Sequence, residues 1–75
     1  MKGKTTTINM GKLGVTNELL DEIRNRMEKY ERVKVKMLRA ARGDKNRREI
    51  AREIAGKLNV RLVEIRGNTF TISGE

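Results

Sequence analysis

The stretch NMGKLGVTNELLDEI, from Asn9 to Ile23, joins a strand-like segment to an amphipathic helix through two glycines. The threonines and Ile8 upstream of it alternate in polarity, which predicts a first strand over Thr5–Met10. Downstream, Thr16 or Asn17 can cap the helix. The apolar positions that recur at helical spacing along it, and form its core-facing stripe, are Leu20, Ile23, Met27 and Tyr30.

Two further segments have clear periods. RVKVKML, from Arg32 to Leu38, alternates strictly and predicts a half-buried strand. Asn46 followed by Glu49 resembles a capping box, so a second helix begins there, and Asn59 can end it in a left-handed conformation. The apolar stripe of this second helix consists of Ile50, Ala51, Ile54, Ala55 and Leu58.

The C-terminal segment VRLVEIRGNTFTIS, residues 60–73, predicts a hairpin with a two-residue type II′ turn at Gly67-Asn68. This turn pairs Ile65 with Phe70 and Val63 with Ile72, and it places all four on one face. The element order is then strand, helix, strand, helix, strand, strand. Strand-helix-strand crossovers are right-handed, so we expect an α/β (α+β) two-layer βαβαββ sandwich: one domain over residues 1–75, with a four-stranded mixed sheet and two helices on one face.

The composition limits the classes of function that this chain can have. Eighteen Lys and Arg against ten Asp and Glu leave a net charge of +8, which favours polyanionic partners. Without Cys or His, the chain lacks disulfides, the usual metal ligands and the usual general base. No nucleophile, acid and base converge, so we expect no enzyme, no cofactor and no metal. The apolar runs are too short to span a membrane, and we expect a cytoplasmic protein.

Basic residues gather in the loops that follow the first three strands, GKLG, RAARGDKN and RGNT. In a sheet with right-handed crossovers these loops lie at one edge, where both helices also point their positive N-termini. We call this edge, with its loops and the first turn of the second helix, the basic edge. Its cations are Lys12, Arg39, Arg42, Lys45, Arg47, Arg48 and Arg66.

The glycine loop has two interpretations. Gly11 and Gly14 can simply make a strand-to-helix turn with Lys12 in solvent, or they can let a sugar-phosphate backbone approach the helix N-terminus, as the GxxG loop of KH modules does. Lys34 and Lys36 can bind backbone across the open sheet face, or they can be a solvated surface that discourages edge pairing. Both pairs are candidates for RNA binding.

In its order of motifs the chain resembles the CRM domain, named for chloroplast RNA splicing and ribosome maturation, and its single-domain YhbY-like members. The resemblance runs from about Asn9 to Ile72, and its specific parts are the G-K-x-G loop with Thr16, the K-V-K strand at residues 34–36 and the G-x-T turn at residues 67–69. It implies a fold similar to the C-terminal half of initiation factor three. It also implies binding of structured RNA, with single-domain members associated with large-subunit ribosomal precursors.

Carried over onto this chain, the resemblance makes Gly11, Lys12, Leu13 and Gly14 the RNA-contacting loop.

Tyr30 and Phe70 are the only aromatic residues, and both fall at expected core positions, so base stacking of the RRM type is excluded. Two other functions stay open: an Alba-like chromatin or nucleic-acid coating protein, and a protein-interaction domain with an acidic partner. Alba-like proteins act as dimers with a long basic hairpin arm, which this chain lacks, so we expect a monomer.

Overall fold

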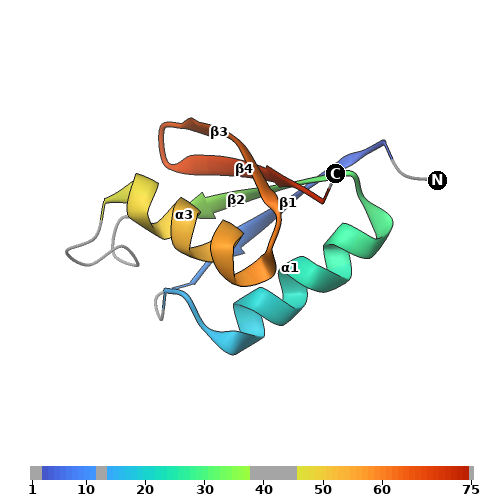
Figure 1. Cartoon of the computed structure of the whole chain (residues 1–75), viewed down its shortest axis with the longest axis horizontal. Helices are drawn as coiled ribbons and strands as arrows, with labels where there is room; N and C mark the ends of the chain where they lie inside the picture. Colours follow the sequence, from blue (N-terminus) through green and yellow to red (C-terminus); the bar gives the residue numbers. More distant parts are fainter. Residues whose placement is uncertain (1–2, 12–13, 38–45, 75) are drawn as a thin grey trace.

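The computed structural model describes residues 3–11, 14–37 and 46–74. Its elements follow the predicted order (Figure 1). They are β1 (Thr5–Met10), α1 (Asn17–Lys29), β2 (Arg32–Met37), α3 (Arg47–Leu58), β3 (Arg61–Arg66) and β4 (Thr69–Ser73). The predicted α+β architecture, with a four-stranded mixed sheet and two helices, is confirmed. The likeness to initiation factor three stays a prediction.

Side-chain and backbone caps set the ends of both helices. Thr16, in an extended conformation, accepts a hydrogen bond from the Leu19 N–H at 3.0 Å and so begins α1. Asn46 does the same for α3, where its Oδ1 accepts from the Glu49 N–H at 2.8 Å. Asn59 ends α3 with φ 55 and ψ 48, the left-handed cap that the sequence predicts.

The strands lie in the order β1-β2-β4-β3. β1 is parallel to β2, and β4 is antiparallel to both of its neighbours, β2 and β3. β2 and β3 therefore run in the same direction without touching, because the returning strand of the hairpin lies between them. As a result β1, β2 and β3 all end at the same edge of the sheet.

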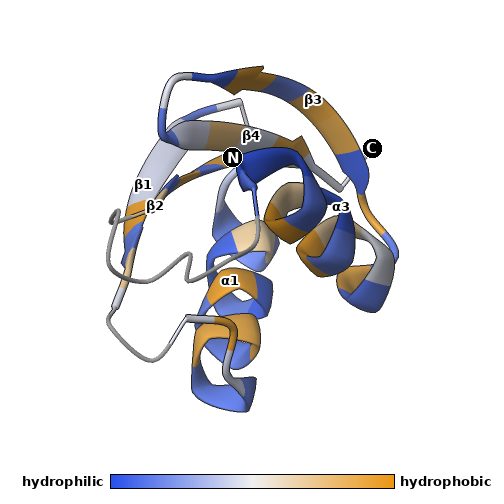
Figure 2. Ribbon diagram, turned by 90° about the vertical axis from the view of Figure 1, so that its left-hand side faces the viewer, coloured by the Kyte–Doolittle hydropathy of each residue, from blue (hydrophilic) through white to orange (hydrophobic). Residues whose placement is uncertain are grey.

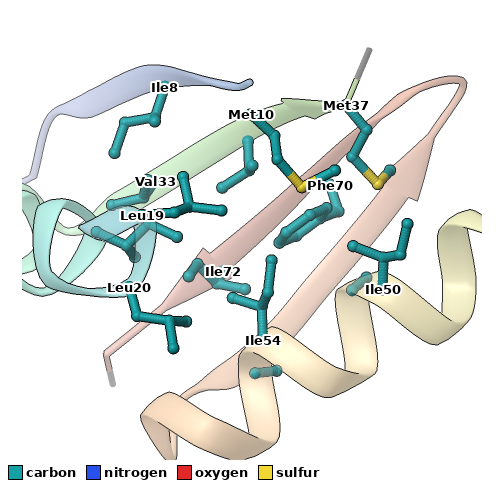
Figure 3. Packing of buried hydrophobic residues seen from close by; sticks show 14 residues of the cluster. Ile8, Met10, Leu19, Leu20, Val33, Met37, Ile50, Ile54, Phe70 and Ile72 are labelled. Carbon is teal, nitrogen blue, oxygen red and sulfur yellow. The ribbon is translucent and has the colours of Figure 1, made fainter. Parts of the chain in front are cut away.

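Both helices cover one face of the sheet and leave the other uncovered (Figure 2). The three residues of β2 that face the helices, Val33, Val35 and Met37, are at most 1% exposed, whereas the intervening Arg32, Lys34 and Lys36 are exposed. Side chains from the strands and from both helices point toward one another in the core (Figure 3). The core cluster comprises Ile8, Met10, Leu19, Leu20, Ile23, Val33, Val35, Met37, Ile50, Ala51, Ile54, Ala55, Phe70 and Ile72.

The predicted hairpin register is right at the turn and wrong beyond it. Ile65 pairs with Phe70, but Ile72 pairs with Leu62 and not with Val63, because a β-bulge interrupts the ladder between Leu62 and Glu64. The extra residue reverses, for the part of β3 before the bulge, which side chains face the core. Leu62 and Ile65 both pack against the core, as a strict alternation could not allow, and Val63 is left half-buried outside it.

The first helix is one position shorter than its predicted apolar stripe. α1 ends at Lys29, and Tyr30 is its extended C-cap, with φ −122 and ψ 146. Leu19 is buried beside Leu20 and Ile23, so the stripe begins one residue earlier. The predicted strand position Leu38 lies outside the described residues.

Candidate nucleic-acid interface

β1, β2 and β3 end at one edge of the sheet, so the segments that follow them all start there. Met10 is paired with Met37 at the last position of the β1–β2 ladder. The Met37 N–H donates to the Asn68 carbonyl at 2.7 Å and ties the hairpin turn to the end of β2. The connections that lead into α1 and α3 leave from the ends of β1 and β2. The ends of β1, β2 and β3 therefore lie at one edge of the sheet, as predicted, whereas most of the loop after β2 lies outside the described residues.

The two glycines of the first loop differ in what the fold requires of them. Gly14 has φ 72, a left-handed conformation, and its N–H donates to the Gly11 carbonyl at 3.1 Å, which closes a turn. Gly11 is exposed and has no left-handed φ, and no described atom lies within 4 Å of the place a Cβ would take. Lys12 and Leu13, the other predicted contacts of this loop, lie outside the described residues.

The first turn of α3 carries two adjacent arginines, Arg47 and Arg48, both exposed. Cations at the positive N-terminal end of a helix are unfavourable for folding, by roughly 0.3–1 kcal/mol each. Only Glu49 in this turn is acidic. The two arginines therefore do not stabilise the helix end, and they add to its positive charge. Three further predicted cations precede α3 in the RAARGDKN segment and lie outside the described residues: Arg39, Arg42 and Lys45.

The hairpin turn brings Arg66 to the same edge. Gly67 has φ 58 and Asn68 has no positive φ, the pattern of the predicted type II′ turn. Arg66 is exposed and pairs with Thr69, which in turn pairs with Lys36 of β2. Arg66 is thus placed both at the edge and on the open face of the sheet, and it connects the two surfaces.

Lys34 and Lys36 line a shallow trough on the open face, about 290 Å³ in volume. The trough also has Arg66 and Glu64 on its walls, and its hydroxyl groups come from Thr7, Thr69 and Thr71. Sequence reasoning missed two further cations of this face. Arg32 is in phase with Lys34 and could have been found from the alternation. Arg61 could not, because the bulge decides which way it faces.

Other kinds of site find little support in the described ranges. They contain no group of three or more His, Cys, Asp or Glu side chains that could hold a metal ion. Within the same ranges, no helix has the length and apolarity needed to cross a bilayer.

Comparison with known families shows which family this chain belongs to. The CRS1 / YhbY (CRM) domain matches residues 2–72, nearly the whole chain. The chain belongs to this family. CRM domains bind RNA, and the family is not known as one of enzymes. A comparison with curated proteins finds no match. The match begins before β1, so it includes the whole of the first strand, of which the motif-based resemblance covers only the last two residues.

Proposed function

We propose that this CRM domain clamps the backbone of structured RNA with its GKLG loop and basic edge. The observation that carries the proposal is the convergence of three strand ends and two helix N-termini at one edge. From the family resemblance we extend the proposal to the assembly of large-subunit ribosomal precursors or to RNA processing, by a cytoplasmic monomer that binds pre-ribosomal or ribosomal RNA.

Each part of the edge has a distinct role in this proposal. Backbone N–H groups at the start of α1 donate hydrogen bonds to a phosphate, and the missing side chain at Gly11 leaves room for the sugar-phosphate chain. Lys12 adds a positive charge to this contact. Arg47 and Arg48 bring charge to the start of α3, where the helix end already favours anions. Arg66 continues the contact toward the sheet. The remaining cations of the second loop, Arg39, Arg42 and Lys45, complete the flanking surface.

A charge-matched pair of variants tests the edge. Replacing Arg42, Arg47 and Arg48 by alanine should lower the affinity for a structured RNA and reduce its salt slope by about one per lost phosphate contact. The control replaces Arg24, Lys29 and Lys57, which are exposed on the helical layer, and removes the same charge. Filter binding at several salt concentrations measures both effects. Equal losses from the two variants would show that net charge alone attracts RNA.

Competition separates the RNA proposal from its alternatives. We expect structured RNA to compete better than duplex DNA or poly-glutamate of equal charge concentration. Stronger competition by duplex DNA would favour a general nucleic-acid coating protein. Stronger competition by poly-glutamate would favour a domain that binds acidic proteins.

A further inference from the structure

The strand order arranges the charges of the open face in two rows. One row lies on β2 and the other on β3, and the uncharged strand β4 separates them. Each residue of β4 that faces outward, Thr69, Thr71 or Ser73, is paired with one charged residue on each side. The pairs across β4 are Lys36 and Arg66, Lys34 and Glu64, and Arg32 and Arg61.

This face holds a large share of the charge of the molecule. The four strands, all of them described, carry five cations and one acid, so their net charge of +4 is half of the total of +8. Helix α1, on the opposite side, carries four acids and three cations. Since both described helices, α1 and α3, lie on the other side of the sheet, they leave the charges of the open face available to a large partner (Figure 2).

The geometry and chemistry of the rows indicate the kind of partner. Two spacings between neighbouring strands put the rows about 10 Å apart, and charges two residues apart along β2 are about 6.6 Å apart. Single-stranded nucleic acid is usually held by stacking on aromatic rings. This face has none, because Phe70 is fully buried in the core and Tyr30 follows α1. A protein surface that offers only charged and hydroxyl groups recognises the shape of a nucleic-acid backbone and not the identity of its bases.

We propose that the open sheet face is a second RNA-contacting surface, which holds a double-helical segment by the two phosphate strands that border its shallow minor groove. The rows of β2 and β3 contact the two strands. Two threonines that line the trough are placed to hydrogen-bond 2′-hydroxyl groups: Thr69, on β4 between the rows, and Thr7, on β1 beside the row of β2. The proposal deepens the proposed function and rests on it, since the basic edge and the face share Arg66.

Glu64 gives this proposal a sharp test, because it is the one acid on the four strands and interrupts the row of β3. Glu64→Gln keeps the shape of the side chain and removes its repulsion of phosphate. Its affinity for a hairpin RNA with a long stem should rise about two- to fivefold at low salt. Glu28→Gln on α1 is the matched control, since Glu28 is also exposed and its loss changes the net charge equally. That control should bind nearly as the parent does.

A loss-of-charge pair tests the other row. Lys34→Gln with Lys36→Gln should weaken binding to the same hairpin roughly 5- to 50-fold, as expected for two lost phosphate contacts. Lys29→Gln with Lys57→Gln removes two lysines from the helical layer and should weaken it less. A single-stranded RNA of equal length should bind the parent more weakly and discriminate less between the two double variants.

The outcomes separate this proposal from the one before it. If Glu64→Gln equals Glu28→Gln and both lysine pairs behave alike while the basic-edge variants lose affinity, the open face does not contact RNA and the edge proposal stands. If poly-glutamate displaces the hairpin as well as duplex RNA does, the face is a general anion surface and the duplex proposal is wrong. If the parent does not bind RNA at all, both proposals fail.

Discussion

At the scale of single residues, the two glycines of the first loop are chemically identical but do different things. Gly14 is needed by the backbone, because its φ of 72 is costly for any residue with a Cβ. The described part of the fold does not require a glycine at position 11, since an added Cβ meets no described atom within 4 Å and the φ of Gly11 is not left-handed. The interpretation of GxxG as a strand-to-helix turn therefore explains Gly14 but not Gly11, whose contact with RNA stays a prediction.

This difference predicts opposite results for two alanine substitutions. Gly14→Ala should lower the free energy of unfolding by about 1 kcal/mol. Gly11→Ala should leave it unchanged or raise it by about 0.4–1 kcal/mol, because alanine restricts the unfolded chain, yet it should weaken RNA binding. Thermal unfolding and filter binding measure the two quantities. Parental affinity in Gly11→Ala would return the whole loop to a structural role.

At the scale of elements, a side-chain hydrogen bond joins α1 to the edge strand β1. The Arg26 Nη1 donates to the Thr6 Oγ1 at 2.6 Å, and both residues are at least partly buried. The nearby Arg24 makes only an ion pair with Asp21, at 3.4 Å, and both of these side chains are largely exposed. Two arginines on one helix thus have different energetic roles, and a charge control for RNA binding should leave Arg26 in place.

Arg26→Ala should therefore lower the free energy of unfolding by about 1.5 kcal/mol or more, as the loss of a hydrogen bond from a charged donor predicts. Arg24→Ala should change it by no more than about 0.5 kcal/mol, since exposed ion pairs contribute little. Urea unfolding with a common m-value gives both numbers. Equal effects would mean that the Thr6 contact does not hold the helix to the strand.

At the scale of the whole molecule, the charge distribution predicts a steep dependence on salt. If the basic edge and the open face together neutralise six or more phosphates, affinity should fall by about 10³-fold or more between 50 and 200 mM salt. The logarithm of the binding constant should be linear in the logarithm of salt concentration. A flat dependence would contradict both RNA surfaces, because each of them acts through displaced counterions.

Much of the architecture could be predicted from local patterns. Polarity alternates every two residues in β2 and apolar residues recur at helical spacing in α3, so the type, order and core-facing side of these elements follow from the sequence. The helix caps at Thr16, Asn46 and Asn59 can also be predicted from the sequence, because each cap depends on residues only a few positions away. The glycine loop and Arg66 could be assigned to one edge for a related reason: right-handed crossovers leave few topologies. The RNA-binding roles of all the candidate residues stay predictions, and five of them, Lys12, Leu13, Arg39, Arg42 and Lys45, lie outside the described residues.

Only the tertiary structure decided where the last strand lies. A hairpin can add to β2 by either of its strands, and the alternation within each strand is the same in both cases. The fold places β4 in the middle, where the outward-facing Thr71 and Ser73 are only 4% and 2% exposed. The bulge at Val63 then brings Arg61 into line with Arg32 across Ser73. Strand order and bulges depend on pairing between segments distant in the chain and on packing against both helices. They cannot be predicted from the local periodicity of the sequence.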